Sequence, residues 1–477
     1  MLFWAIFPIF LIVFLLLGPR WPLVKVAPLA FGSSALIAIL IWKLPAFELL
    51  YPLVKGLLLA LDISFIILGA LCLSYYLKST GHTERLLGQL NLLSQNRPEL
   101  VLLFAWFFGS FIEAVSGFGT PGAIIAPFLC ALGIMPIKAI AITLAANSTA
   151  VTFGAVGTPM RVGMADYLDL DFLPLIGKLN FIPAMIMPFV ILYLLGPNLV
   201  RKYALTALLS GLFFWIPYFV GTLLGIEYPS IMGGGIGFLL MLFYLARKSQ
   251  DFNYREFFQS FFPYIALVII LFVGKSIFAS FDYRLALGEH LHHNIGPFNP
   301  GFAFFTLILM MALIYPLKWR ELFGGKDSFF PLLFKTFLSI FFIGSLTYLM
   351  VMTDGYFEDA NGMMQVLAIE LLSPSLTYYS VFIGAFGSFL AGSATVSNLL
   401  FTPLQALGAT QFDLNLALVL ALQATGAAAG NMVALPNILA IKAAVQYEGS
   451  EGSVLKKLFI PCFLYLFIVA LVSNIFI

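Results

Sequence analysis

Charged side chains are scarce in this sequence: Asp, Glu, Lys and Arg make up only 10% of its 477 residues. Soluble domains devote roughly 25% of their residues to these types, which supply most of the positions that face water. A soluble protein of this length could not cover its surface with so few charges. The composition therefore excludes an ordinary soluble fold. The net charge of +2 also argues against a nucleic-acid-binding protein, which needs a clustered basic surface.

Cysteine and histidine are also scarce, with three and four residues respectively. The cysteines lie in apolar stretches, and an odd number cannot pair fully, which excludes a secreted disulfide scaffold. All four histidines fall in predicted loops: His82, His290, His292 and His293. Because no spacing of His, Cys or paired carboxylates indicates metal ligation, we expect no metal site, no cofactor and no catalytic centre.

Apolar residues, in contrast, make up 61% of the sequence, and the mean hydropathy is +1.02. An apolar stretch of roughly 17–25 residues can cross a membrane as a helix. Twelve such stretches are predicted: 1–18, 26–43, 56–77, 137–157, 174–196, 203–224, 231–246, 261–281, 301–317, 329–352, 414–445 and 457–477. The first lacks the basic start and the cleavage site of a signal peptide, so we retain it as a span. The predicted fold class is an all-α polytopic membrane protein.

Two further apolar stretches, 100–133 and 376–408, are interrupted near their middle by small and polar residues. The interruptions read Ser116-Gly-Phe-Gly-Thr-Pro121 and Gly392-Ser-Ala-Thr-Val-Ser-Asn398. Non-helical backbone at membrane depth is tolerated only where it is buried in protein or lines a polar cavity. We therefore predict two re-entrant hairpins, each of which enters and leaves on the same side.

The basic residues sort to one side of this predicted topology. Sixteen Lys and Arg lie in the loops 19–25, 78–99, 134–138, 197–202, 247–260, 318–328 and 446–456, with Lys457 at the boundary of the last. Only four lie on the other side: Lys43, Lys55, Arg161 and Arg284. Because cytoplasmic loops carry the excess of Lys and Arg, the first side is predicted to be cytoplasmic and both termini external.

The two halves of the chain share a series of landmarks. Gly-Ser-Phe opens both hairpins, at Gly109 and Gly387, and each hairpin continues with Thr-Pro and then Ala-Leu-Gly. A helix interrupted by small and polar residues follows in each half, over 137–160 and 414–445. The predicted organisation is a first unit over 1–202, linker helices over 203–246 and a second unit over 261–477.

Each unit has five predicted crossings, an odd number, so the second unit should lie inverted relative to the first. Inverted-topology repeats with paired interrupted segments are typical of secondary transporters, which bind their substrate between those segments near the midplane. Glycine-containing packing interfaces, common in membrane helices, are the alternative explanation of the small residues. The recurrence of a hairpin followed by an interrupted helix favours the repeat.

Three stretches at these landmarks carry a recognisable pattern. They are Phe111-Ile-Glu-Ala-Val-Ser-Gly-Phe-Gly-Thr-Pro121, Ala145-Ala-Asn-Ser-Thr-Ala-Val-Thr-Phe-Gly-Ala-Val-Gly-Thr-Pro159 and Gly392-Ser-Ala-Thr-Val-Ser-Asn-Leu-Leu-Phe401. Together they resemble the signatures of the bacterial L-lactate permease family. The resemblance implies uptake of L-lactate, and in some members glycolate or D-lactate, by proton symport across the bacterial inner membrane.

A small 2-hydroxy acid presents a carboxylate and a hydroxyl, and its burial in a membrane requires fixed donors in place of water. Helix N-termini provide unpaired N–H groups and about half a positive charge, and glycine lets the backbone approach closely. The predicted substrate-binding residues are Gly117, Gly119, Thr120, Asn147, Ser148, Thr149, Ser393, Thr395, Ser397, Asn398, Thr425 and Asn431. The alternative is that these polar side chains only cap the ends of the interrupted helices.

Ionisable residues within a membrane are costly and are therefore candidates for function. Glu113 lies in the first hairpin, where burial favours the protonated carboxylic acid, and it is predicted to carry the symported proton. Asp62 in the third span is the second candidate. Lys442 could neutralise the anion or extend to the membrane surface, and Arg161 could attract anions or be an ordinary loop residue.

Other functions are open at this stage. A sodium-coupled carboxylate carrier needs no dedicated acid, because backbone carbonyls at helix interruptions can hold the ion. A channel would carry a ring of charges or a filter motif, which the sequence lacks. An intramembrane enzyme would need convergent catalytic groups. The preferred hypothesis is a proton-coupled transporter in contact with membrane lipid.

The predicted topology places Arg247 and Arg284 on opposite faces of the membrane. Single cysteines at these positions of a cysteine-free variant should react with a membrane-impermeant maleimide only from the inside at 247 and only from the outside at 284. Labelling of both positions from the same face would contradict the topology with two re-entrant hairpins.

Overall fold

The computed structural model describes residues 1–19, 21–91, 96–117, 120–168, 171–247, 254–278, 283–286, 292–295, 299–315, 330–356 and 361–476. Within these ranges the chain is helical apart from one small hairpin of strands, which confirms the all-α class. Strand β1 (Tyr283–Ala286) pairs antiparallel with β2 (His292–Ile295). The sequence predicts a loop here, and the strands correct that prediction.

The first half of the chain forms sixteen helical elements of varied length. Two more helices, in the segment predicted as a linker, come after this half. The former are α1 (Leu2–Leu17), α2 (Leu23–Leu40), η1 (Ala46–Leu49), α3 (Leu50–Ser79), α4 (His82–Asn91), α5 (Arg97–Val101), η2 (Leu102–Phe108), α6 (Gly109–Val115), α7 (Thr120–Ala131), α8 (Pro136–Asn147), η3 (Ala150–Phe153), α9 (Gly154–Gly163), η4 (Ala165–Tyr167), α10 (Leu173–Leu179), α11 (Phe181–Leu195) and α12 (Pro197–Lys202). The latter are α13 (Ala204–Leu224) and α14 (Pro229–Ala246).

The second half contains the remaining helices. They are α15 (Tyr254–Phe278), α16 (Gly301–Ala312), α18 (Phe330–Tyr356), α19 (Met363–Leu371), α20 (Leu376–Ala391), α21 (Ala394–Gln411), α22 (Leu416–Gly430), η5 (Asn431–Val433), α23 (Leu435–Ala444) and α24 (Glu451–Ser473). Every predicted span coincides with at least one helix of the first half, the linker or the second half.

Nine helices in the described ranges are long and apolar enough to cross a membrane, or eleven if each of two bent pairs counts as one span. The count differs from the predicted twelve partly because α1 and α16, with 16 and 12 residues, are shorter than a usual crossing. The entering arm of the first predicted hairpin, Arg97–Val115, is by contrast long enough to span. The helix α19 and the 43° bend between α10 and α11 have no counterpart in the prediction.

The chain breaks where the sequence predicts interruptions. α6 ends at Val115 before α7 begins, and α20 ends at Ala391, just before α21. The segment predicted as an interrupted helix over 137–160 bends by 54° between α8 and the η3–α9 pair. Ala155 and Val156 have positive φ angles of 44° and 55° there. Such angles are strained for residues with a side chain, so surrounding packing must hold this bend.

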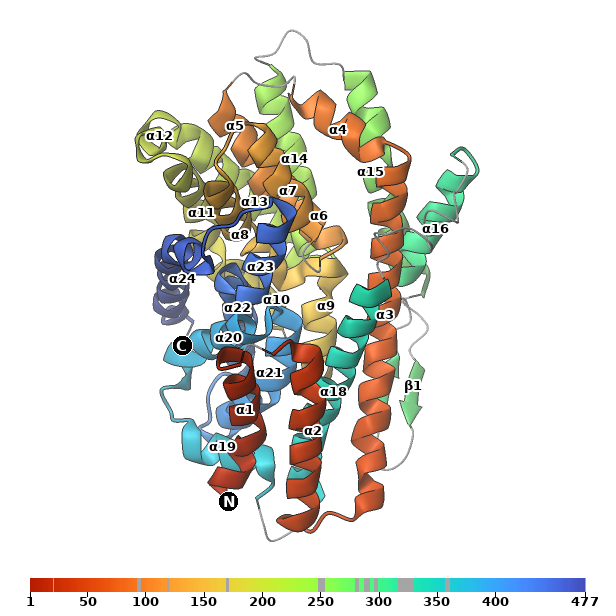
Figure 1. Ribbon diagram of the computed structural model, residues 1–477, viewed down its shortest axis with the longest axis vertical. Coiled ribbons are helices and arrows are strands. Elements are labelled where there is room, and N and C mark those ends of the chain that lie inside the picture. Colours follow the sequence, from red (N-terminus) through yellow and green to blue (C-terminus); the bar gives the residue numbers. More distant parts are fainter. Residues whose placement is uncertain are drawn as a thin grey trace.

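Figure 1 shows how these breaks are arranged in space. The helices α5, α6 and α7 lie in the upper half of the view, and α20 and α21 lie in the lower half, with α8, α9, α22 and α23 between them. The helices α4 and α12, in segments predicted to share one side of the membrane, lie toward the upper end. The helix α19, in a segment predicted for the other side, lies toward the lower end.

The helices α20 and α22 pack with their backbones in direct contact. A Cβ added at Gly426 would lie 1.9 Å from the carbonyl oxygen of Val381, and one added at Gly430 would lie 2.2 Å from that of Ala385. Small residues allow membrane helices to approach this closely, and van der Waals contact then holds them together. The first arm of the second hairpin is thereby packed tightly against the second interrupted helix.

Gly426→Ala should therefore destabilise the protein, because the methyl group would overlap the Val381 carbonyl. Overpacking of this kind costs about 1–3 kcal/mol. Gly32→Ala is a matched control, since a Cβ added at Gly32 in α2 meets no atom within 4 Å and alanine favours the helix. Thermal unfolding in detergent should show a lower Tm for Gly426→Ala only. Equal Tm values would contradict this packing.

Candidate functional site

A cavity of about 380 Å³ lies where the interrupted segments meet. The tips of both hairpins line it, through Glu113, Gly117 and Gly122 in the first and residues 391–396 in the second. Residues of both interrupted helices, within 143–159 and 431–441, form further parts of the wall. The starts of α2 and α18 complete the lining.

Glu113 and Asn147 form a polar pair on the cavity wall. The Asn147 Nδ2 donates a hydrogen bond to Glu113 Oε2 at 2.9 Å. Glu113 is only 6% exposed, and a Cβ added at Gly154 would lie 2.5 Å from its Oε1, so glycine is required beside the carboxyl group. The Oδ1 of Asn147 is buried and has no hydrogen-bond partner among the described residues. The pair thus offers the cavity a carboxyl group and an amide oxygen that can still accept a hydrogen bond.

The tip of the first hairpin touches the break in the first interrupted helix. Gly117 has a φ of +55°, and a Cβ added there would lie 2.8 Å from the Cβ of Ala155. Hydrogen bonds from two side chains stabilise the break itself. Thr158 Oγ1 donates to the Ala155 carbonyl, and Ser230 Oγ donates to the Ala150 carbonyl at 2.7 Å. Gly117 and Thr158 both line the cavity.

The tip of the second hairpin places the start of a helix against the cavity. Gly392 ends α20 with a φ of +69°, and Ser393 then caps α21 by accepting a hydrogen bond from the Val396 N–H at 3.4 Å. The lining includes Ser393 and Thr395, together with Asn431 on the second interrupted helix. Asn431 Oδ1 accepts from Asn437 Nδ2 at 2.7 Å. Ser393 and Asn431 thus line the cavity and also satisfy local polar groups.

Other predicted substrate-binding residues lie away from the cavity lining. Ser397 and Asn398 of α21 are fully buried, and Ser397 Oγ donates to the Gly384 carbonyl of α20 at 2.7 Å. Asn398 Nδ2 donates to the Pro159 carbonyl at 3.1 Å. Gln423 Nε2 donates to both Ser397 and Asn398 at 3.2 Å. This network joins the second hairpin to both interrupted helices.

Three more predicted residues, Ser148, Thr149 and Thr425, are also absent from the cavity lining. Ser148 Oγ donates to the Ala145 carbonyl at 2.8 Å, and Thr149 Oγ1 shares a hydrogen bond of 3.3 Å with the Tyr465 hydroxyl. Thr425 is fully buried, and its hydroxyl has no hydrogen-bond partner within the described ranges. Gly119 lies outside the described residues, and Thr120 begins α7 with a side chain that also lies outside them.

Lys335 and Thr143 line the cavity and were missed by the sequence analysis. Lys335 lies near the start of α18, and it forms no ion pair with the described residues. Thr143 is 3% exposed, and no described residue forms a hydrogen bond with its hydroxyl. The signal that could have found Lys335 is a charge inside an apolar span. Glu113 and Lys335 are the ionisable residues among those that line the cavity.

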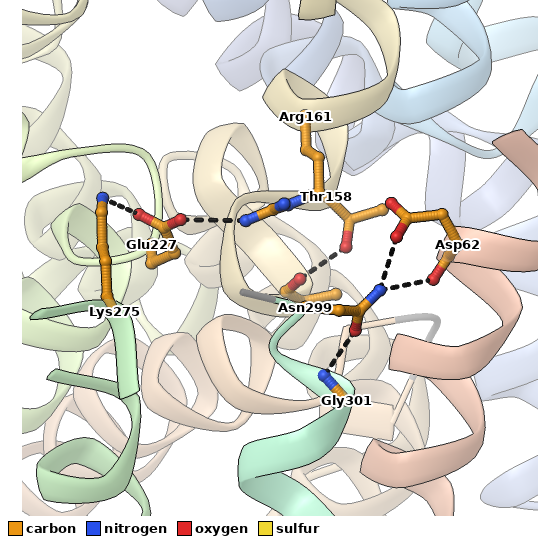
Figure 2. A network of polar contacts seen from close by, with 8 residues as sticks. Asp62, Thr158, Arg161, Glu227, Lys275, Asn299 and Gly301 are labelled. Atoms are coloured by element: carbon orange, nitrogen blue, oxygen red, sulfur yellow. Dashed lines mark hydrogen bonds and ion pairs between the residues drawn. The ribbon is translucent and has the colours of Figure 1, made fainter. Parts of the chain in front are cut away.

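The remaining ionisable candidates form ion pairs or hydrogen bonds outside the cavity, as Figure 2 shows for Arg161 and Asp62. Arg161 is not a loop residue but part of α9, and it pairs with Glu227 at 3.0 Å. Asp62 Oδ1 accepts a hydrogen bond from Asn299 Nδ2 at 2.6 Å. Lys442 pairs with Glu451 at 2.5 Å. None of these three is among the residues that line the described cavity.

The sequence matches the model of the L-lactate permease family over residues 2–261 and 297–477. A protein of Haemophilus influenzae named as a candidate L-lactate permease is 29% identical, with 85% of each chain covered. The L-lactate permease of Bacillus subtilis and the glycolate permease of Escherichia coli are each 24% identical, with 89% of this chain and 86% of theirs covered. Because the family match extends over both halves, this chain belongs to the L-lactate permease family.

Proposed function

We propose that this protein is a secondary active transporter that imports L-lactate, or a related 2-hydroxy monocarboxylate such as glycolate or D-lactate, across the bacterial inner membrane. Membership of a family whose relatives are named as permeases for L-lactate and glycolate supports this class of function. The observation that carries the proposal is the single cavity on which both hairpins and both interrupted helices converge. In transporters built from repeats, substrates bind at such a junction.

The two units, 1–202 and 261–477, are proposed to be inverted repeats. Each contains a helix pair broken at a hairpin tip, followed by an interrupted helix and a last span. The helices of the first hairpin lie in the upper half of Figure 1 and those of the second lie in the lower half, as inversion requires. Movement of one group of helices past another would then open the cavity alternately to the two sides.

The proposed carboxylate site lies between the start of α21 and Lys335. Residues Ser393 to Val396 form the first turn of α21 and line the cavity. The free N–H groups of a helix start carry about half a positive charge and bind anions. Lys335 supplies a full positive charge to the same cavity. This arrangement replaces the water that a carboxylate loses when it enters the membrane.

The second polar group of the substrate is its hydroxyl, which is proposed to bind Asn147. The buried Oδ1 of Asn147 can accept a hydrogen bond, and its Nδ2 is already used by Glu113. Glu113 is proposed to carry the coupled proton, because it is buried on the cavity wall and its carboxyl group has no ion-pair partner in the described chain. A lactate anion and a proton would then cross together without net charge. Sodium coupling is the alternative.

Asn147→Ala and Ser393→Ala should each reduce lactate uptake far more than they reduce the amount of protein in the membrane. The loss of a buried hydrogen bond from Ser393 to the charged carboxylate costs roughly 1.5–3 kcal/mol, or on the order of 10–150-fold in affinity. The loss of the Asn147 bond to the neutral hydroxyl costs about 0.5–1.5 kcal/mol, or on the order of 2–10-fold. Ser148→Ala is the matched control, because the Ser148 hydroxyl bonds the Ala145 carbonyl within its own helix. Uptake measured at several lactate concentrations distinguishes the variants. Normal uptake by both would place the substrate elsewhere.

Glu113→Gln should abolish proton-driven accumulation of lactate in proteoliposomes and retain exchange of labelled for unlabelled lactate. Glutamine keeps the shape and hydrogen bonds of a protonated glutamate but cannot release a proton. The unmodified protein should accumulate lactate with a proton gradient alone, and this measurement tests the proposed function directly.

Asp62→Asn is the control for the coupling role of Glu113, since Asp62 is bonded to Asn299 away from the cavity. Intact accumulation by Glu113→Gln would remove the proton role from this residue. A defect in Asp62→Asn, or a requirement for sodium, would then identify the coupling ion or its site.

A further inference from the structure

Arg161, Glu227 and Lys275 form an ionic cluster, which Figure 2 shows beside Thr158. Arg161 Nη2 lies 3.0 Å from Glu227 Oε1, and Lys275 Nζ lies 2.6 Å from Glu227 Oε2. The side chains of Arg161 and Glu227 are only 15% and 10% exposed. Two cations face one carboxylate, so the cluster has a surplus of one positive charge. A partly buried surplus of this kind attracts an anion.

The guanidinium group of Arg161 is only partly used within the cluster. Its contact with Glu227 runs through Nη2, and its Nε is buried without a hydrogen-bond partner in the part of the chain that the structure describes. Nearly all buried donors in proteins are paired, so this N–H can donate to an acceptor that binds at another stage. Adjacent N–H groups of arginine form a fork that binds both oxygens of a carboxylate. Arg161 therefore has the geometry for a second carboxylate.

The cluster lies next to the central cavity. Thr158 and Pro159 line the cavity, and Arg161 follows Thr158 by three residues, on the same face of α9. The turn that carries Glu227 is pressed against the break in this helix, because a Cβ added at Gly157 would lie 2.5 Å from the Ile226 carbonyl oxygen. The same turn belongs to a loop that the distribution of Lys and Arg predicts to be external.

We propose that Arg161 is a second carboxylate site, at which the substrate replaces Glu227 on its way from the outer surface to the central cavity. This inference rests on the proposed transport function. Each oxygen of Glu227 has its own cation, so Glu227 can leave Arg161 and stay paired with Lys275. The exchange replaces one carboxylate by another and leaves no charge unpaired. The ligand class is a small monocarboxylate, since the surplus charge of the cluster is one.

Glu227→Gln tests this exchange, because it removes the internal competitor for Arg161. The KM for lactate uptake into intact cells should fall several-fold. Asp166→Asn is the matched control: it removes a carboxylate that is 59% exposed and lies 4.0 Å from Lys55. A general electrostatic attraction would change both variants alike. An unchanged or higher KM for Glu227→Gln, at a normal level of folded protein, overturns the proposal.

Arg161→Lys provides a second test that does not depend on the folding of the first variant. Lysine keeps the charge and the pair with Glu227 but lacks the fork, so the KM should rise several-fold while the Tm stays near that of the unmodified protein. A KM equal to that of the unmodified protein overturns the second site. A lack of lactate uptake by the unmodified protein would instead overturn the proposed function.

Discussion

The need to satisfy backbone hydrogen bonds inside a membrane governs this structure. Each interruption of a helix leaves carbonyl and N–H groups without their usual partners, and lipid offers none. Ser230 of α14 supplies one such partner, because it donates to the Ala150 carbonyl at the break of the first interrupted helix. Ser397 and Asn398 of α21 donate to the Gly384 carbonyl within α20 and the Pro159 carbonyl within α9. Side chains of neighbouring helices thus hold the broken segments in place.

The same hydrogen bonds join the broken segments to one another. Asn398 of α21 reaches the Pro159 carbonyl in α9, and a Cβ added at Gly163 would lie only 2.1 Å from the Asn398 Cβ. Gln423 of α22 connects to the same asparagine. Two kinds of segment therefore form the wall of the cavity. One is the set of broken segments that contact one another, and the other is the starts of the continuous helices α2 and α18.

The placement of charges follows a related rule. A charge that leaves water must find a partner, so Glu227 is held by two cations and Lys442 by Glu451. Glu113 differs, because it is buried on the cavity wall and has no ion-pair partner in the described chain, whereas the Lys335 side chain that lines the same cavity is exposed. A buried ionisable group without a partner is costly unless a ligand or a proton uses it.

The sequence by itself determined the membrane class and the positions of the four interruptions, and it selected Glu113 and Asn147 as candidates, because apolar content and runs of small residues are local properties. It could not separate Asn147 from Ser148, which are adjacent but differ in direction: one faces the cavity and the other bonds its own helix. Nor could it find the partner of Asn398, which lies 239 positions away. Nothing in the sequence singles out Lys335 or Glu227 either, because their surroundings also come from distant segments. Only the tertiary structure decides which polar groups face a common space, because local bends and contacts between distant segments set the direction of each side chain.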